Sequence, residues 1–487
     1  PKRYEKTYLN WLENIQDWCI SRQIWLGHRI PVFTCDNGHT FASEEDPKCC
    51  PICQNKNLTQ DNDVLDTWFS SALWPFSTLG YPNETDDLKY YYPTSTLVTG
   101  YDIITFWVSK MVFSGIKFMK DIPFKDVVIH GLVRDINGVK MSKHLGNGVD
   151  PIDMIDKYGA DSLRLSLING MSMGTDIKYG EEKAKETKIF INKLYNASKF
   201  VLQNLEYMTF VPIENLKLQE KDKWILNELD ALIKSVTKNI DRYAFGVATS
   251  NLIEFTVSKF CDWYIELSKV DLYGDDIDKK NKTQNVLYYV LDNLLKLFHP
   301  FIPFVTEYIY QEMPHHEETI MLTKFPSKLK LKNLNNNFDY IIEVIKSIRN
   351  ARAGFNVPDN KRTEIYLQVE QNKDLIYENL SEIAKLAYGT KCNIVIDEPK
   401  EKCAKVLLEG IKIYIPMGQL VDSDKEKERL KKEIQNVKFE IERSQRMLSN
   451  EGFVSKAPQN LIDNEKIKLE TNKNRLIQLE KEIEEYN

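Results

Sequence analysis

The sequence lacks any apolar run that is long enough to cross a lipid bilayer. Its most apolar stretch, residues 286–305, contains Asp292, Lys296 and two prolines, which is typical of a buried amphipathic helix. An initiator methionine and a signal peptide are also missing from its first residues, PKRYEKTYLNW. We therefore expect no membrane contact, and we expect the chain to be the later part of a longer protein.

The sequence also lacks the evenly distributed cysteines that a disulfide framework requires. The chain has 8 cysteines, and four of them crowd into one short segment beside His39 while the others are scattered. This distribution favours a reducing compartment and a single metal site over an oxidised framework of disulfides.

The crowded segment has the spacing of a zinc site. The pair Cys35-x3-His39 is followed by the pair Cys50-x2-Cys53, and two such pairs of soft ligands can surround one tetrahedral Zn²⁺. Cys49 competes with Cys50, because the run CCPIC offers two spacings. A loop with free thiols is the alternative. Four protein ligands would close the site, so we expect a structural rather than a catalytic zinc.

Basic residues are not in excess, since the net charge is −6 and the pI is about 5.8. This argues weakly against nucleic-acid binding, although a whole-chain sum can hide a local patch. A P-loop of the form G-x-x-x-x-G-K-[ST] is absent. The stretch VKMSKHLGN instead places Lys140 and Lys143 on a polar loop between Gly138 and Gly146. A solvated loop would explain the lysines, but so would a loop that closes over phosphates.

Strand-like runs lie just upstream of the two lysines. STLVTG predicts a strand that ends at Gly100, YDIITFWVSKMVFSGIKF a helix, and FKDVVIHG a buried strand that ends at His130 and Gly131. This order predicts an α/β sheet that binds ligands at the carboxyl ends of its strands. Asp102, at the junction of strand and helix, could then reach a ribose hydroxyl.

Aromatic and apolar residues occur close to this junction. Ile103 and Trp107 are four residues apart on one face of the predicted helix, and Trp68 lies in DVLDTWFSSALWPF. Core packing is the ordinary interpretation of such a set. The alternative is that the three side chains form the wall of a small apolar pocket.

Shifts in composition and periodicity divide the chain into several domains. Apolar stripes near 3.6-residue spacing predict a helical bundle in the middle of the chain, followed by a small module with one helix and short strands. The predicted segments are 1–34 (α/β domain), 35–60 (zinc-knuckle insertion), 61–185 (α/β domain with the lysine loop), 186–335 (helical bundle), 336–420 (small α/β module) and 421–487 (helical hairpin).

The last segment has a heptad pattern on each side of a break at residues 449–458, where Gly452 and Pro458 interrupt the helix. Two heptad helices joined by a turn predict an antiparallel coiled-coil hairpin. The residues of the two seams are Leu430, Ile434, Val437, Ile441 and Leu448, then Ile462, Leu469, Leu476, Leu479 and Ile483.

Several motifs together resemble one family. KMSKHLGN resembles the KMSKS signature of class I aminoacyl-tRNA synthetases. NWLENIQDWCISRQIWLGHRIPV, DVLDTWFSSALWPFSTLGYP, LVTGYDIITFWVSKM and FKDVVIHGLVRDINGVKMSK are similar to segments of the valyl-tRNA synthetases. The resemblance continues through KLYNASKF, FCDWYIELSK, HPFIPFVTE and SIRNARAGFNVP to NEGFVSKAP, so it covers nearly the whole chain. Isoleucyl enzymes, the nearest alternative, differ around TGYD and lack this C-terminal segment.

The resemblance implies a monomeric valine–tRNA ligase that uses ATP and Mg²⁺ to form valyl-adenylate and then transfers valine to tRNA(Val). It implies that the α/β domain is the second half of a Rossmann-type catalytic domain. It also implies that the bundle binds the anticodon stem and that the terminal hairpin braces the tRNA. The implied site residues are Lys140 and Lys143 for catalysis; Gly100, Asp102, His130, Gly131, Lys140, Ser142 and Lys143 for ATP; and Trp68, Ile103 and Trp107 for the valine side chain.

The sequence departs from the family pattern at three places. His144 replaces the final serine of the signature, and we expect it to face solvent; the first zinc pair is Cys-x3-His; and no HIGH-type motif occurs in the 487 residues. In this family that motif and the editing insertion lie N-terminal to the segment with which this chain begins. We therefore predict that the 487-residue chain alone does not activate valine, because one wall of the ATP site is missing.

Two alternatives belong to other classes of protein. A non-catalytic tRNA-binding protein derived from a synthetase would not need the lysine pair or the pocket residues, so their presence argues against it. A zinc-ribbon nucleic-acid binder with a coiled-coil dimerisation arm explains only residues 35–53 and 421–487, and it predicts a dimer.

Overall fold

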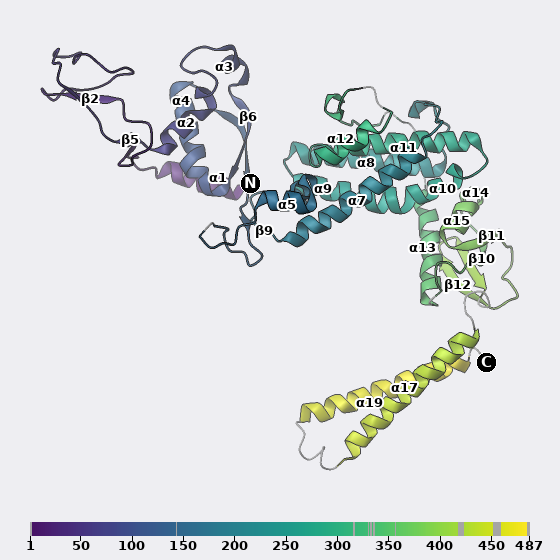
Figure 1. Cartoon of the computed structure of the whole chain (residues 1–487). Coiled ribbons are helices and arrows are strands. Elements are labelled where there is room, and N and C mark those ends of the chain that lie inside the picture. The colour runs from purple at the N-terminus through teal and green to yellow at the C-terminus, as the bar shows by residue number, and fades with distance from the viewer. Residues whose placement is uncertain are drawn as a thin grey trace. The chain divides into compact units, whose positions relative to one another are not determined.

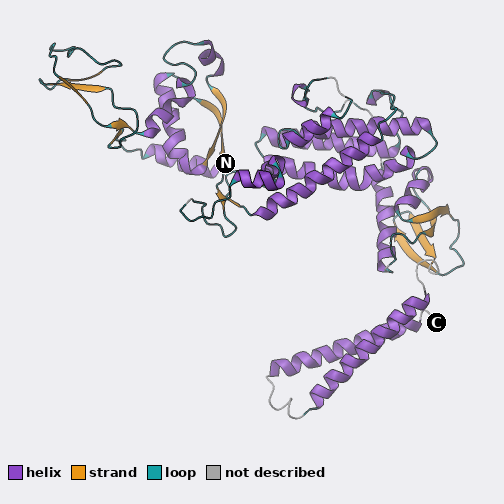
Figure 2. Ribbon diagram, in the orientation of Figure 1, coloured by secondary structure: helices purple, strands orange, loops and turns teal. Residues whose placement is uncertain are grey.

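The computed structural model describes residues 2–142, 144–314, 317–329, 331, 334, 337–355, 357–416, 423–450 and 459–484 (Figure 1). The chain forms two compact units. The first consists of residues 1–203, 229–257 and 290–329, and the second of residues 204–228, 258–289 and 330–487. Helices predominate, and the strands are confined to the N-terminal part and to the region of β10–β13 (Figure 2). Among the described residues, no helix combines the length and the apolar character that crossing a bilayer requires.

The first unit contains two parallel strands joined by a helical crossover. Gly100 at the end of one strand lies opposite His130 at the end of the other. Buried side chains, with Met111 and Phe124 among them, pack the crossover against the strands. The predicted order of strand, helix and strand is therefore confirmed, and the carboxyl ends of both strands meet at one edge. The elements are β6 (Thr94–Gly100), η1 (Tyr101–Ile103), the π-helical η2 (Ile104–Val108), α4 (Ser109–Phe118) and β7 (Phe124–His130).

A buried carboxylate connects the segments that precede these strands. Asp66 accepts hydrogen bonds from the indole N–H of Trp18 at 2.9 Å, from Arg22 at 2.7 Å and from the backbone N–H of Trp68 at 3.3 Å. It therefore caps the helix that carries Trp68, as aspartate commonly does at a helix N-terminus. The elements here are α1 (Lys2–Glu13), β1 (Ser21–Arg22), β5 (Val64–Leu65), α2 (Thr67–Ser77) and α3 (Asp86–Tyr91).

The cysteine-rich segment folds on a three-stranded antiparallel sheet with strand order β3-β2-β4. Phe33 and Phe41 stack across the first pair of strands, with ring centroids 6.1 Å apart. The turn between these strands is closed by a hydrogen bond from the N–H of Cys35 to the carbonyl of His39. The strands are β2 (Val32–Cys35), β3 (Thr40–Ala42) and β4 (Leu58–Gln60).

The chain after β7 enters a region of short strands and helices that leads into the bundle. Asp161, at the start of one helix, accepts hydrogen bonds from the backbone N–H groups of Phe304 and Val305, and so caps a helix far away in sequence. The elements are β8 (Val133–Arg134), α5 (Pro151–Tyr158), α6 (Ala160–Ile168), β9 (Ile177–Lys178) and α7 (Glu181–Gln203).

The bundle helices follow the apolar stripes of the sequence. The apolar stripe in VATSNLIEFTVSKFCDWYIELSKV, residues 247–270, predicts one continuous helix, but a long π-helical segment interrupts it. The elements are η3 (Ile213–Asn215), α8 (Glu220–Asp241), α9 (Phe245–Glu254), η4 (Phe255–Ile265), α10 (Glu266–Leu272), α11 (Ile277–Phe298), α12 (Pro303–Gln311) and η5 (Ile320–Leu322).

A partly buried histidine in this bundle, His299, predicts one pH effect. His299 Nδ1 lies 2.9 Å from Thr306 Oγ1, and burial lowers the pKa of His299 although Glu307 and Asp161 oppose the shift. Because the folded pKa is below the unfolded value of about 6.5, the unfolded chain binds the proton more readily. This contribution to stability is present above about pH 6.5 and is lost as the pH falls.

We therefore expect His299→Gln to lose less stability than the unaltered chain between about pH 7.5 and pH 5.5. The urea midpoint measured at both pH values tests this expectation. His28→Gln is the control, because His28 is exposed. An equal response of both variants to pH would contradict it.

The second unit contains a four-stranded mixed sheet with strand order β11-β10-β13-β12. The sequence predicts a helix over YIIEVIKSIRNARAGF and strands over TEIYLQV, CNIVID and IKIYIP, which correspond to α13, β10, β11 and β13, whereas β12 and two short helices were not predicted. Arg352 is buried in this module, where its guanidinium donates to Thr363 Oγ1 and to the carbonyl of Lys361. The elements are α13 (Phe338–Gly354), β10 (Thr363–Val369), α14 (Lys373–Glu378), α15 (Leu380–Leu386), β11 (Gly389–Ile394), β12 (Cys403–Leu408) and β13 (Ile411–Pro416).

Two long helices follow, α17 (Ser423–Ser449) and α19 (Gln459–Glu484). Glu433 pairs with Arg475 and Glu440 with Lys468, and Ser444 donates to Glu465, so the partners in α19 come earlier as the residues in α17 come later and the helices run antiparallel. Residues 451–458 of the break predicted at 449–458, and the side chains of Leu430 and Ile483, lie outside the described residues. The contact between the helices is made by six of the predicted seam residues, Ile434, Val437, Ile441, Leu469, Leu476 and Leu479.

Candidate active site and metal centre

The edge where β6 and β7 end collects four of the predicted ATP residues. A Cβ added to Gly100 would lie 2.7 Å from the carboxylate of Asp102 and 3.6 Å from the His130 ring, so these groups crowd around the glycine. His130 Nδ1 lies 2.7 Å from the carbonyl of Gly131. The side chains of Asp102 and His130 are exposed at this edge, where a bound ligand would meet them.

The lysine loop approaches the same edge. Lys140 Nζ lies 3.8 Å from Asp102 Oδ2, and both side chains are exposed. Met141 packs against Met154 and Tyr179, which anchors the loop between the two predicted lysines. Lys143 lies outside the described residues.

Two further residues of the predicted loop can be placed. The backbone N–H of Ser142 donates a hydrogen bond to the side chain of Asn147 in the same loop. The Ser142 hydroxyl accepts a hydrogen bond from the N–H of Leu145 at 3.2 Å. His144 is exposed, as predicted.

Hydrogen bonds of two side chains that were not predicted from the sequence, Asn147 and Asp135, hold this loop in place. Asn147 accepts the N–H of Ser142 at 2.9 Å and donates to Asp135 at 2.9 Å. Asp135 also accepts the N–H groups of Asn137 and Val139, which closes the turn at Gly138 with its φ of 85°. The hydrogen bond from Asn147 is the largest cause of the lowered pKa of Asp135. The only sequence signal was the G-N pair that follows the lysines.

A second missed residue, Asp176, joins the loop to the strand edge. Its carboxylate accepts hydrogen bonds from the N–H of Leu132 at 2.9 Å, from the Tyr101 hydroxyl at 3.1 Å and from the Arg134 guanidinium. The bond from Leu132 is the largest cause of the lowered pKa of Asp176. Asp176 therefore ties together the residues that follow β6 and β7, but no sequence spacing connected it with them.

Gly131 occupies a position that admits no side chain. A Cβ built there would lie 2.0 Å from the carbonyl oxygen of Thr175, a backbone atom that cannot move aside cheaply. We expect Gly131→Ala to lower the free energy of unfolding by about 1–3 kcal/mol, measured by urea denaturation. Gly100→Ala is the matched control, because its new methyl group would crowd the movable carboxylate of Asp102 at 2.7 Å but would make ordinary van der Waals contacts at 3.6 Å with His130 and Leu132. Equal losses in the two variants would contradict the argument.

The predicted valine-pocket residues lie on two packed elements, α2 and the η1–η2 segment. Trp68 stacks on Phe106, with ring centroids 6.1 Å apart, and Trp107 lies 6.1 Å from Trp74. The indole N–H of Trp107 donates to the carbonyl of Ser71, and its ring packs against the buried cluster between crossover and strands. Ile103 ends η1 and is partly buried. Trp68 and Trp107 thus each pack against a different aromatic side chain, and Trp107 also contributes to the hydrophobic core.

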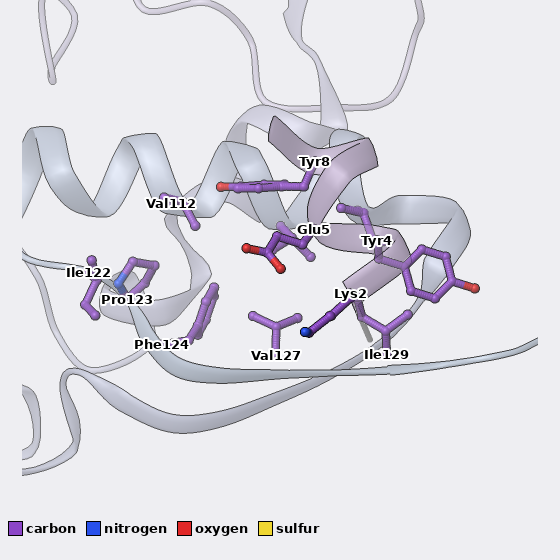
Figure 3. Close-up of a pocket in the computed structure, with 12 residues that line it drawn as sticks. Lys2, Tyr4, Glu5, Tyr8, Val112, Ile122, Pro123, Phe124, Val127 and Ile129 are labelled. Carbon is purple, nitrogen blue, oxygen red and sulfur yellow. The ribbon is translucent and has the colours of Figure 1, made fainter. Parts of the chain in front are cut away.

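A separate hollow of about 440 Å³ lies between α1 and β7 (Figure 3). Its walls are mainly apolar, with Phe124, Val127 and Ile129 on the β7 side and Tyr8 on the α1 side. The residues that line it include none of those predicted to bind ATP, valine or metal. The hollow is therefore distinct from the strand edge at which the candidate ATP residues gather.

The predicted zinc ligands converge in the first unit. The ligand atoms of Cys35, His39, Cys50 and Cys53 all lie within 4.8 Å of one another. Hydrogen bonds from the backbone of Asn55 and from the Asn37 side chain lower the pKa of Cys53 to about 6, whereas burial raises the pKa of Cys35. Thiolate is the form of cysteine that binds a metal.

The distances within this cluster suit a tetrahedral ion. Zinc bonds of about 2.3 Å to sulfur and about 2.0 Å to nitrogen would separate the ligand atoms by roughly 3.5–3.8 Å. The Cys35 sulfur lies 3.5 Å from His39 Nδ1 and 3.7 Å from the Cys53 sulfur, and the Cys50 sulfur lies 3.9 Å from His39 Nδ1. Cys49 instead directs its thiol to Gln54 Oε1 at 3.2 Å. The structure therefore places Cys50, not Cys49, in the cluster.

Three family models match successive parts of the chain. Residues 1–180 match class I tRNA synthetases for I, L, M and V, residues 222–367 match the anticodon-binding domain of tRNA ligases, and residues 422–486 match the valyl tRNA synthetase tRNA binding arm. A valine–tRNA ligase of Clostridium acetobutylicum is 48% identical over 99% of this chain and 56% of its own length. The chain belongs to the valyl-tRNA synthetase family.

Other comparisons agree with this membership in the valyl-tRNA synthetases. A valine–tRNA ligase of Carboxydothermus hydrogenoformans is 49% identical over 96% of this chain and 54% of its own length. The chain thus spans about half the length of the curated valyl-tRNA synthetases that it matches. A leucyl-tRNA synthetase of Agrobacterium radiobacter K84, solved in a ternary complex with tRNA and LeuAMS, shares the fold. Its TM-score is 0.53 at 19% identity, over 67% of this chain and 46% of that one.

Proposed function

We propose that this chain supplies the second half of a Rossmann-type catalytic domain, the anticodon-binding bundle and the tRNA-binding arm of a cytoplasmic valine–tRNA ligase. The observation that carries the proposal is the approach of Lys140 to Asp102 beside Gly100, at the carboxyl ends of two parallel strands. Parallel α/β sheets bind ligands at this edge.

The proposed reaction has two steps. The valine carboxylate attacks the α-phosphorus of ATP, so that valyl-adenylate forms and pyrophosphate leaves; the terminal ribose hydroxyl of tRNA(Val) then attacks the valyl carbonyl, and AMP leaves. Negative charge grows on the phosphate oxygens in the first step, and cationic donors aimed there lower the barrier. We assign this role to Lys140 and Lys143, with Mg²⁺ bound by ATP itself.

The remaining nucleotide contacts follow from the strand edge. Asp102 is exposed beside Gly100, where its carboxylate could accept a ribose hydroxyl. Gly100 and Gly131 allow the backbone to approach the nucleotide closely. His130 would lie against the nucleoside, and the loop residue Ser142 against the phosphates.

The proposed pocket for the valine side chain is the apolar wall made by Trp68, Ile103 and Trp107. The packing of α2 against η2 supports it, because that packing brings Trp68 to Phe106, the residue next to Trp107. The cap at Asp66 orients the helix on which Trp68 lies.

We also propose one structural Zn²⁺, held by Cys35, His39, Cys50 and Cys53. It would cross-link the turns that flank β2 and β4 and would take no part in the chemistry, because four protein ligands leave no open position. The two helices α17 and α19 would form a coiled-coil arm that contacts tRNA(Val) from a monomeric enzyme.

A chimera tests the proposed reaction. In it, this chain replaces the matching 56% of the Clostridium acetobutylicum relative. We expect valine-dependent exchange between ATP and pyrophosphate, and charging of tRNA(Val); exchange that depends on isoleucine instead would support the alternative specificity. The 487-residue chain alone is expected to give no exchange, because it contains no HIGH-type motif.

Lysine variants of the same chimera test the residue roles. Lys140→Ala and Lys143→Ala should each lower the exchange rate by about 10²–10³, the usual effect of removing one donor to developing charge. His144→Ala is the control, because that side chain is exposed and lies outside the proposed contacts. Activity that survives loss of both lysines would refute the assignment.

A further inference from the structure

A cleft of about 630 Å³ in the second unit lies far along the chain from the proposed active-site residues. It is lined by η4, α10, α13, α15 and the residues that flank β10 and β11. Four cationic side chains, Lys346, Arg349, Arg362 and Lys385, line it together with the aromatic rings of Trp263 and Tyr388.

Arg349 is held in this cleft as a preorganised cation. Its guanidinium carbon lies 5.3 Å from the centre of the Trp263 ring and 5.2 Å from that of the Tyr388 ring. Its Nε donates to the carbonyl of Leu386 at 2.6 Å, which leaves the two terminal nitrogens to bind a ligand. A planar guanidinium with its two terminal nitrogens available matches two phosphate oxygens at once.

The backbone at Tyr388 indicates that this arrangement is specific. Tyr388 has a φ of 57°, in the left-handed region that bulky side chains rarely adopt. Backbone strain of this kind persists where the surrounding structure imposes it, and it is frequent at binding sites. The strained residue supplies one of the two rings that contact Arg349.

Cationic residues outnumber acidic residues in the lining of the cleft, four to two. None of the four cations forms an ion pair within the described part of the chain. The two acidic residues that line the cleft are Asp262 and Glu266, and Glu266 is paired with Lys269 at 2.6 Å. A chain with a net charge of −6 thus keeps four positive groups together and unpaired, and such a cluster attracts a polyanion.

We propose that this cleft binds the phosphate backbone of the tRNA. Arg349 would bind one phosphodiester, and Lys346, Arg362 and Lys385 would contact the adjacent phosphodiesters. The proposal rests on the proposed function, which makes tRNA the partner. Most of the lining residues fall within residues 222–367, the part that matches the anticodon-binding domain of tRNA ligases. Several cations spread over one open cleft suit a repeating polyanion better than a single free phosphate.

Two charge-matched variants of the 487-residue chain test the proposal. The first is Lys346→Gln/Arg362→Gln/Lys385→Gln, which removes the exposed cations of the cleft and leaves Arg349 in place. The control is Lys373→Gln/Lys391→Gln/Lys400→Gln, which removes three exposed cations from the same unit outside the cleft. Both triples change the net charge equally, so a difference between them reports position rather than total charge.

Binding of a tRNA(Val) transcript, measured by fluorescence anisotropy over a range of salt concentrations, gives the readout. We expect the cleft triple to bind about ten-fold more weakly than the control at near-physiological salt. The slope of log K against log salt should fall by about 2. Arg349→Lys keeps the charge but loses the planar fork, so it should weaken binding while changing the slope little.

The outcomes separate the two proposals. If the unaltered chain binds tRNA(Val) and the two triples bind equally well, the cleft proposal fails while tRNA binding stands. If the unaltered chain does not bind tRNA(Val), the part of the proposed function that makes tRNA the partner is refuted, and so is the cleft proposal that rests on it. Stronger displacement of tRNA by an oligoglutamate than by unlabelled RNA would assign the cleft to an acidic protein segment instead.

Discussion

Replacing Lys221 by methionine is expected to lower the free energy of unfolding of the second unit by about 3–5 kcal/mol. The Lys221 side chain is only 1% exposed, and its Nζ lies 2.8 Å from Asp271 and 3.0 Å from Glu382. Burial acts to lower the pKa of Lys221, but the charges of Glu382 and Asp271 outweigh it and the pKa is raised. Methionine would fill the space but leave two buried carboxylates without their cation.

The network explains why the loss should be large. The three residues come from α8, α10 and α15, and Asp271 also accepts hydrogen bonds from Gln219 and Thr283. The bundle helices and the small module of the second unit thus share one buried ion cluster. An uncompensated charge there costs far more than the loss of a surface pair.

Two companion variants make this prediction specific, with urea denaturation as the measurement. Lys223→Met is the control, since Lys223 is partly exposed and pairs with Glu220 on one helix; its loss should stay below about 1 kcal/mol. Adding Asp271→Asn and Glu382→Gln to Lys221→Met should restore part of the lost stability, because the two carboxylates that pair with Lys221 are then neutral amides. A Lys221→Met chain that unfolds at the same urea concentration as the control would disprove the argument.

Cys50→Ser is expected to abolish stoichiometric zinc binding, whereas Cys49→Ser should keep about one zinc per chain. Cys50 lies buried within the ligand cluster, but the Cys49 thiol donates to Gln54 and lies outside it. Structural zinc contributes about 10–16 kcal/mol in small zinc domains, so its loss should unfold the sheet of β2, β3 and β4. Metal analysis of the purified chains measures the first effect.

Limited proteolysis measures the second effect. Residues 35–60 should become sensitive to protease in Cys50→Ser and in the chelator-treated unaltered chain, and should remain protected in Cys49→Ser. Equal metal content in the two serine variants would show that Cys50 is dispensable. A metal content of zero in the unaltered chain, purified with zinc present, would remove the metal site altogether.

The elements of the fold were largely predictable from local sequence because they depend on local properties. Apolar runs that end in glycine predicted β6 and β7, and stripes near 3.6-residue spacing predicted the bundle helices. The seam residues of α17 and α19 followed from their heptads. The π-helical segment η4 and the strand β12 were not predicted, since neither leaves a distinctive periodicity in the sequence.

The candidate site was predictable only in part. Lys140, Asp102 and His130 were found because motif and strand end lie close together in the chain. Asp176 and Asn147 hold that site in shape but were missed, because their partners are set by the path of the chain and not by spacing.

By itself the sequence determined the family, the order of the domains and the residue types available for phosphate, an apolar side chain and zinc. Only the tertiary structure chose Cys50 over Cys49, because the two adjacent side chains point in different directions on the same turn. It alone brought Lys346 and Arg349 together with Arg362 and Lys385 in one cleft. Charge composition is a sum over the chain, whereas a binding surface depends on where folding places each charge.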